Sequence, residues 1–155
     1  MNRKTVSKSG DSNEGSKKAV AAKLGSCIRM FLRNDAKLLA LNASERAITH
    51  KLAEYLANRF PGWDVDCEYD RILEETKRLR IRGRLARVIP DIIIHRRNTG
   101  RNLMVIEAKK DNDRRGGAGD LEKLREFKQQ LGYRHAVFLM FRTGENPGIE
   151  IPVWI

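Results

Sequence analysis

The sequence predicts a single α/β domain built around a mixed β-sheet. Apolar residues recur at helical spacing after Asn42, three strand-like segments follow between residues 63 and 108, and a second helical segment leads into a further strand pattern. The order is therefore helix, three strands, helix and one or two strands. A length of 155 residues suits one domain with one core.

The N-terminal segment, residues 1–18, predicts a disordered basic tail. It is rich in Ser, Gly and Lys and has almost no large apolar side chain, so burial cannot offset its ordering entropy. Such a tail either grips phosphates or is merely solvated, and the sequence does not separate these two interpretations. We expect the folded domain to span residues 19–155.

Two helices should open the domain. A broken helix over 19–41 places four apolar side chains on a common face: Leu24, Ile28, Phe31 and Leu32. The second helix is expected to begin at Asn42 as its N-cap, with Glu45 three positions later, and to end at Phe60-Pro61-Gly62.

The strands follow from alternation and from aliphatic runs. Trp63–Tyr69 alternates apolar and polar residues, and Val88–His95, Leu103–Ala108 and Ala136–Phe141 read as strands, with Ile149–Ile155 as a further candidate. Residues 70–87 give no clear pattern. A polar loop over 110–119 should lead to a helix that is capped by Asp120 and ends at Gly132.

The segments 88–95 and 103–108 are expected to pair as a β-hairpin. Asn98-Thr99-Gly100 suits a three-residue loop with Gly100 in the left-handed position. Centring the hairpin on Thr99 places Ile93 opposite Val105, His95 opposite Leu103 and Asp91 opposite Glu107. Because side chains alternate along a strand, Lys109 should emerge on the same face as Glu107.

Two facing carboxylates in aliphatic strands are energetically costly. Like charges directly opposite destabilise a sheet, and a buried carboxylate either shifts its pKa or finds a cation. Lys109 supplies one positive charge, and Mg²⁺ typically binds one or two carboxylates together with water and substrate phosphate. The pattern predicts a metal site between Asp91 and Glu107. The alternative is that Asp91 merely starts a strand after Pro90 and that Glu107 and Lys109 form a solvated strand end.

Pro90-Asp91 followed by Glu107-Ala108-Lys109, in this order of elements, resembles the PD-(D/E)xK nuclease superfamily, which has the restriction-endonuclease-like fold. The resemblance covers about residues 42–141. It implies an αβββαβ core with a four-stranded mixed sheet flanked by helices, and endonucleolytic hydrolysis of phosphodiester bonds in DNA. Asp91, Glu107 and the Ala108 carbonyl would then bind Mg²⁺, for which Mn²⁺ could substitute. Lys109 would orient or help deprotonate the attacking water and stabilise the developing charge.

Many members of that superfamily also place a glutamate of the first helix in the site, and Glu45 is the candidate for this catalytic and metal-binding role. Its alternative role is as the capping-box partner of Asn42. No serine or cysteine constellation suggests a covalent nucleophile, and His50, His95 and His135 are isolated in the sequence.

A formal net charge of +11 indicates an anionic partner, most often nucleic acid, with an acidic membrane surface as the alternative. The predicted phosphate contacts lie in one segment without an acidic residue: Lys77, Arg78, Arg80, Arg82, Arg84 and Arg87. If that segment is extended, the arginines at 78, 80, 82 and 84 share one side; the alternative is a solvated charged edge. Glu68 and Arg71 are either secondary site residues or an ordinary surface pair.

Asp120 with Lys123, and Gln129 with Tyr133, are weaker signals, because helix capping and the helix end at Gly132 explain them adequately. With two cysteines and no long apolar run, the chain is expected to be cytoplasmic and without a membrane partner. Cutting both strands of a duplex would require a homodimer, because one site cuts one strand. The competing hypothesis is a nucleic-acid-binding module that does not catalyse.

Overall fold

The structure is a computed structural model, and it describes residues 15–113 and 117–155. Four helices lie in this part of the chain: α2 (Lys17–Asn34), α3 (Ala36–Ala40), α4 (Glu45–Arg59) and α5 (Ala118–Leu131). Because α2 begins at Lys17, the last two residues of the predicted tail are helical. Residues 1–14 of that tail lie outside the described residues.

The main sheet is mixed, as predicted. Its order is β1 (Asp64–Cys67), β6 (Ile92–His95), β7 (Asn102–Lys110), β8 (His135–Arg142) and β10 (Val153–Trp154), and β9 (Gly148–Ile149) also pairs with β8. Only β7 and β8 are parallel. Within the described residues this sheet thus has six strands: four that correspond to the strands expected for the core, and two short C-terminal strands where the sequence offered one candidate.

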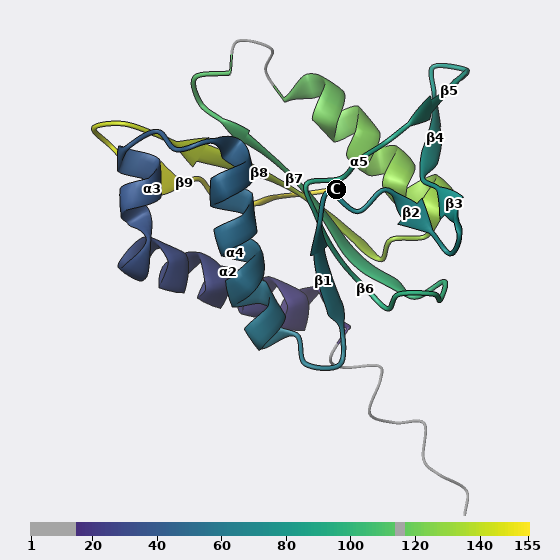
Figure 1. The fold of residues 1–155 in the computed structure, drawn as a ribbon, viewed down its shortest axis with the longest axis horizontal. Coiled ribbons are helices and arrows are strands. Elements are labelled where there is room, and N and C mark those ends of the chain that lie inside the picture. Colours follow the sequence, from purple (N-terminus) through teal and green to yellow (C-terminus); the bar gives the residue numbers. More distant parts are fainter. Residues whose placement is uncertain (1–14, 114–116) are drawn as a thin grey trace, which may run out of the picture.

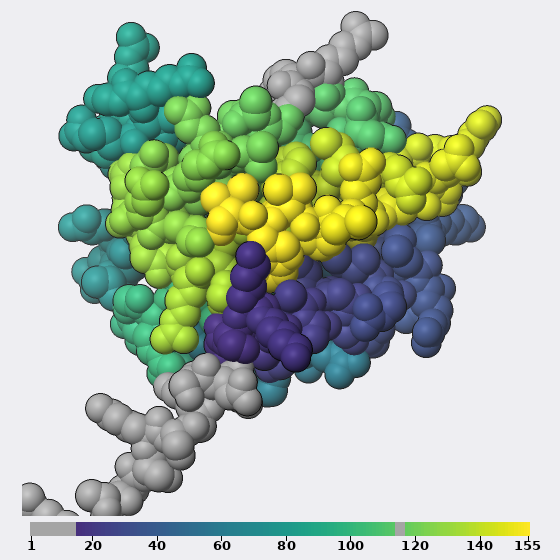
Figure 2. Space-filling model, turned by 180° about the vertical axis from the view of Figure 1, so that it is seen from behind, coloured from purple at the N-terminus to yellow at the C-terminus, as the bar shows by residue number. Residues whose placement is uncertain are grey.

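Helices cover both faces of this sheet. Figure 1 shows α2, α3 and α4 on one side and α5 on the other. Alternate residues of β7 enter the two cores, with Met104 and Ile106 facing α2 and α4 while Val105 faces Leu124 and Phe127 of α5. On the opposite side of the molecule, the C-terminal segment runs over the surface between α5 and α2 (Figure 2).

The start of α4 differs from the prediction. Asn42 has a φ of 52° and cannot be the N-cap; Ser44 caps the helix, and its hydroxyl accepts a hydrogen bond from Ala47 N at 3.2 Å. Glu45 is therefore the first helical residue, and the capping-box interpretation is wrong. At α5, Gly117 rather than Asp120 is the N-cap, whereas Gly132, with a φ of 67°, ends the helix as predicted.

Residues 71–87 fold into two ribbons instead of one extended run. The first pairs β2 (Arg71–Ile72) with β3 (Glu75–Thr76), and the second pairs β4 (Arg78–Ile81) with β5 (Arg84–Arg87). Arg82 and Gly83 both have positive φ, 49° and 78°, which is the backbone of a tight hairpin turn. The expectation that four arginines line one side of an extended segment is therefore wrong.

The β6–β7 hairpin keeps most of the predicted register. Ile92, Ile93 and Ile94 pair with Ile106, Val105 and Met104. The register then shifts, so that His95 pairs with Asn102 and not with Leu103. The left-handed loop residue is Asn98, with a φ of 57°, and not Gly100. The strand itself is shorter than predicted, since it begins at Ile92 instead of Val88.

Candidate active site

Asp91 and Glu107 lie on the same face of the sheet, the face covered by α5. Asp91 immediately precedes β6, and its Oδ2 accepts a hydrogen bond from Ala108 N at 2.7 Å. Ile93 and Val105, two residues away from Asp91 and Glu107 along their strands, both pack in the core beneath α5. The confirmed register and this hydrogen bond bring the two carboxylates together at one end of the sheet.

Glu107 is the most constrained acid of the site. Its residue is 2% exposed, its Oε2 lies 2.8 Å from Lys123 Nζ, and its buried Oε1 has no hydrogen-bond partner among the described residues. Burial, and then the neighbouring charge of Asp91, raise the pKa of Glu107 to about 8. A further cation bound at Oε1 would lower the free-energy cost of keeping the buried Glu107 carboxylate ionised.

The pKa of Asp91 is also raised, chiefly by burial and further by Glu45 and Asp120. Its hydrogen bond from Ala108 N and the charge of Lys123 oppose that shift. Both central carboxylates are therefore poorly compensated by the protein, as expected for ligands of a cation.

Two lysines flank this pair and share one carboxylate. Lys109 Nζ lies 3.5 Å from Asp113 Oδ2 and 3.5 Å from Asp120 Oδ2, while Lys123 Nζ lies 3.7 Å from Asp120 Oδ1. Burial lowers the pKa of Lys109, but Asp120, Glu45 and Asp113 together raise it above its ordinary value. The Lys109 ammonium is thus held charged beside the acids.

Glu45 reaches the same end of the sheet from the opposite layer. Its Oε2 accepts a hydrogen bond from Lys110 N at 3.2 Å, and its charge acts on both Asp91 and Lys109. The structure therefore brings together four predicted site residues: Glu45, Asp91, Glu107 and Lys109.

The donor set fits a hard divalent cation with few protein ligands. Within residues 15–113 and 117–155, no group of three His, Cys, Asp or Glu side chains could hold a metal ion by itself. Mg²⁺ needs fewer, because it usually keeps several waters and binds one or two carboxylates together with substrate phosphates. Asp91 and Glu107, with the orphaned Oε1, satisfy that requirement.

A groove of about 380 Å³ opens onto Asp91. It is lined by Arg46, Glu68, Asp70, Arg87, Ile89 and Asp91. Glu68 follows β1 with a left-handed φ of 50°, donates its backbone N–H to Asp91 O at 3.1 Å, and pairs with Arg46. A non-glycine residue held in this conformation beside an acidic pair is typical of functional sites.

Glu68 and Arg71 do not form a pair. Arg71 is exposed, lies 3.8 Å from Asp70 Oδ1 and donates to Thr76 Oγ1 at 3.4 Å. It lines a second, smaller pocket beside β2 and does not line the groove at Asp91.

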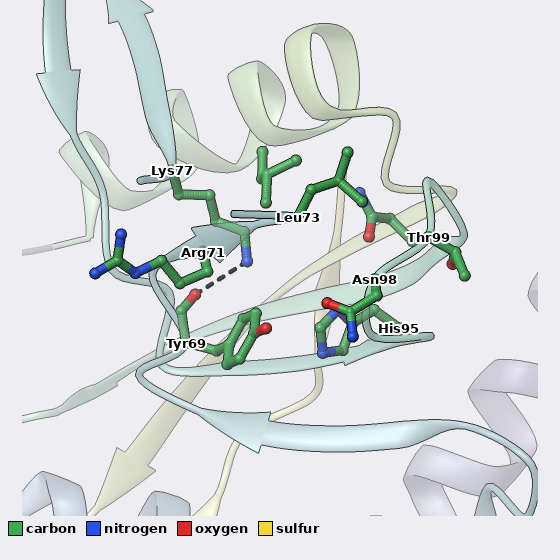
Figure 3. A pocket seen from close by; sticks show the side chains of 9 residues that line it. Tyr69, Arg71, Leu73, Lys77, His95, Asn98 and Thr99 are labelled. Carbon is green, nitrogen blue, oxygen red and sulfur yellow. Dashed lines mark hydrogen bonds between the residues drawn. The ribbon is translucent and has the colours of Figure 1, made fainter. Parts of the chain in front are cut away.

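Lys77 is not on the surface. Its residue is 1% exposed, and its Nζ donates to Tyr69 O at 3.0 Å (Figure 3). The same Nζ lies over the rings of Tyr69 and Tyr133. Burial lowers the pKa of Lys77 to about 8. The predicted phosphate contact is therefore wrong for this residue in the conformation observed.

The other basic residues of the segment are exposed: Arg78, Arg80, Arg82, Arg84 and Arg87. Arg82 pairs with Glu122 of α5 at 2.9 Å, and Arg87 pairs with Asp70. Gln130 of α5 bonds both Arg80 N and Arg80 O at 2.8 Å, and Leu79 is fully buried. The arginines thus stand on a ribbon that is fastened to α5 and projects from the body of the protein (Figure 1).

Sequence reasoning undervalued three residues of this region: Asp120, Lys123 and Arg46. Asp120 and Lys123 are three positions apart in the first turns of α5, so both point toward the strand that carries Glu107. The sequence did contain a signal for Asp120 and Lys123: an acid and a lysine three positions apart, in the helix that follows the Glu-x-Lys strand. Nothing in the sequence indicated Arg46.

No helix in the part of the chain that the structure describes is long and apolar enough to cross a membrane. Comparison of the chain with family models, with curated proteins and with solved structures gave no match in any of the three. The fold and this arrangement of side chains are therefore the features from which a function is inferred.

Proposed function

We propose that the protein is a Mg²⁺-dependent nuclease of the PD-(D/E)xK kind that hydrolyses phosphodiester bonds in DNA. The observation that carries this proposal is the buried Glu107: its Oε1 has no hydrogen-bond partner among residues 15–113 and 117–155, and it lies in one cluster with Asp91 and two lysines. The order α4, β1, β6, β7, α5, β8, with β7 and β8 parallel, also agrees with the αβββαβ core expected from the sequence.

Asp91 and Glu107 would hold the cation, with the Ala108 carbonyl and Glu45 as further candidates. When bound, Mg²⁺ supplies a Lewis acid and makes an attacking water more acidic. The buried Glu107 beside the partly buried Asp91 lowers the stability of the metal-free protein, and in the proposed enzyme this loss keeps a site ready for the cation. Mn²⁺ should serve as well, because it accepts the same oxygen ligands.

The chemistry requires no covalent intermediate. A water oxygen forms a new bond to phosphorus, the bond from phosphorus to one sugar oxygen breaks, and that oxygen leaves as a hydroxyl. Lys109, held by Asp113 and Asp120, can orient the attacking water, and the ammonium groups offset the negative charge that develops on the phosphoryl oxygens.

The β4–β5 ribbon supports a nucleic-acid substrate. Arg78 lies directly opposite Arg87, so the ribbon places two positive charges side by side, and the pair of Arg87 with Asp70 offsets only one of them. The ribbon leads through Ile89 to the groove at Asp91. Phosphates bound along it would therefore be delivered to the candidate site.

The same ribbon favours a duplex over a single strand. Single-strand binders use aromatic side chains as stacking platforms, and residues 77–89 contain none. A two-stranded ribbon fits the major groove of B-form DNA, whereas the major groove of an RNA helix is too narrow and deep. We therefore propose double-stranded DNA as the substrate.

The test is cleavage of plasmid DNA in Mg²⁺, with and without EDTA, by wild type and by Asp91→Ala and Glu107→Gln. We expect cleavage by wild type only, and only with the metal, while all three proteins bind DNA in Ca²⁺. Glu54→Gln, an exposed acid on α4 paired with Lys51, is the matched control and should cut normally.

Cutting by Asp91→Ala at the wild-type rate would exclude this site. Binding without cutting by the wild type, on duplex, single-stranded and branched DNA with Mg²⁺ or Mn²⁺, would favour the non-catalytic binding module.

A further inference from the structure

The two lysines of the site have different partners. Lys109 Nζ lies 3.5 Å from both Asp113 Oδ2 and Asp120 Oδ2, and within the described residues it makes no ion pair with Asp91 or Glu107. Lys123 Nζ, in contrast, lies 2.8 Å from Glu107 Oε2. Lys109, the lysine of the Glu-x-Lys pattern, therefore does not contact the buried Glu107, whereas Lys123 does.

Lys123 is placed by a well-anchored helix. It lies one turn into α5, whose Leu124 and Phe127 are fully buried. Its side chain is 22% exposed, against 3% for Glu107, so its ammonium connects the buried carboxylate to the surface. Lys123 can therefore reach both Glu107 and a ligand that arrives from solvent.

Lys123 also has a second position available. Asp120 Oδ1 is 3.7 Å from its Nζ, on the same helix and three residues earlier. A divalent cation at Glu107 would neutralise that carboxylate and repel the ammonium at short range. A small rotation of the flexible side chain would then bring the ammonium to Asp120 and free its N–H donors for an anion.

We propose that Lys123 is a catalytic residue: it holds Glu107 before a cation binds and then turns to the scissile phosphate, while Lys109 stays with Asp113 and Asp120. This inference rests on the nuclease function proposed above. Lys123 forms and breaks no covalent bond in the reaction. Its three N–H groups donate to phosphoryl oxygens as negative charge develops on them.

Lysine acetylation in the full chain, measured at each residue by mass spectrometry, tests this movement without depending on turnover. We expect Lys123 to react slowly without a divalent cation, several-fold faster in Ca²⁺, and slowly again when a DNA duplex is added. Lys109 should not become faster in Ca²⁺, and exposed Lys18 serves as the reference. In Glu107→Gln, Lys123 should react fast with or without Ca²⁺.

A thermal shift in Ca²⁺ shows separately whether the cation binds. If it binds and the reactivity of Lys123 does not change, the inference is overturned and the nuclease proposal stands. If no cation binds, both are overturned.

The rate of DNA cleavage in a single turnover is the second test of the role of Lys123. Lys123→Met should slow cleavage by about 100-fold or more while duplex affinity in Ca²⁺ stays within about threefold of wild type. Lys109→Met should be less impaired, and Lys123→Arg should recover part of the rate. Arg125→Met, an exposed charge removed from the same helix, is the control and should cut normally. If Lys109→Met slowed cleavage more than Lys123→Met, the assignment of Lys123 as the catalytic lysine would be overturned.

Discussion

At the scale of single residues, the chain keeps charged groups where a stability-optimised protein would have apolar ones. Glu107 and Lys77 are both buried, and the pKa of each is displaced to about 8 from opposite directions. Each displacement makes folding depend on pH, because the folded and unfolded chains then bind different numbers of protons. Stability falls with rising pH for the buried acid and with falling pH for the buried base, so the two residues can be tested separately.

Replacing Glu107 should stabilise the metal-free protein. Between its ordinary pKa of 4.5 and the folded value of about 8, the folded chain holds a proton that the unfolded chain has lost, so stability falls as the pH rises through this range. Glu107→Gln removes that dependence and should be more stable than wild type at pH 8.5, by about 2 kcal/mol, and similar near pH 4.5. Urea unfolding in EDTA measures this; lower stability of the variant at pH 8.5 would contradict it.

Lys77→Met should also be stabilising near neutral pH. The unfolded chain takes up a proton at Lys77 below pH 10.5, but the folded chain does so only below about 8. Stability is therefore lost as the pH falls through this window and does not return below it. After allowance for the lost hydrogen bond to Tyr69 O, we expect a gain of about 1–2 kcal/mol at pH 7 that disappears above pH 10.5. A loss at every pH in urea unfolding would show that the hydrogen bond and ring contacts outweigh the cost of desolvation.

At the scale of elements, the β4–β5 ribbon would separate binding from catalysis in the proposed nuclease, because Arg78 and Arg80 make no ion pair with Asp91 or Glu107 among the described residues. Its inner face is fixed by Leu79, by Gln130 and by the pair of Arg82 with Glu122, so the Arg78 and Arg80 side chains can be shortened while these attachments remain.

Arg78→Ala with Arg80→Ala should weaken duplex binding in Ca²⁺ and reduce the slope of log affinity against log salt by about 2, one for each lost phosphate contact. The matched control is Arg29→Ala with Arg33→Ala, two exposed arginines of α2 on the other side of the sheet. Fluorescence anisotropy over a salt series distinguishes the two pairs. Equal losses for both would mean that the ribbon acts only through net charge.

The elements that were predictable are those with strong local signals. Alternation and aliphatic runs located β1, β6, β7 and β8, and Gly132 located the end of α5. The ribbons over 71–87 were not predictable, because β5 is exposed along its whole length and β4 buries only Leu79 fully, so neither has a long apolar face to reveal its period.

Within the site, local spacing was sufficient to place Asp91, Glu107 and Lys109, since one hairpin joins them. Lys123 depends instead on how α5 packs on β7: its spacing from Asp120 was a local signal, but that spacing alone did not show that Lys123 contacts Glu107. The ion pairs of Arg46 with Glu68 and of Arg87 with Asp70 are likewise tertiary contacts between segments that no short motif connects.

At the scale of the whole molecule, one chain carries one Asp91–Glu107 pair. A single copy is therefore expected to cut one strand of a duplex, and a double-strand break to require a second copy. Supercoiled plasmid should first become open circular, and the linear product should rise more steeply than linearly with protein concentration. Gel electrophoresis over a concentration series measures this, and linear product formed in proportion to protein, with no open-circular intermediate, would contradict it.

Helix α5 joins the ribbon and the carboxylate cluster in a single rigid body. The ribbon is attached at Glu122 and Gln130, and Asp120 and Lys123 lie at the first of these attachments. Eight residues of helix separate the two attachment points by about 12 Å, roughly the rise of three to four base pairs. Because a helix neither stretches nor bends easily, α5 would fix, in the proposed nuclease, the distance along DNA between the arginine contacts and the bond to be cut. Inserting one helical turn between Lys123 and Gln130 should move the cut by one to two base pairs.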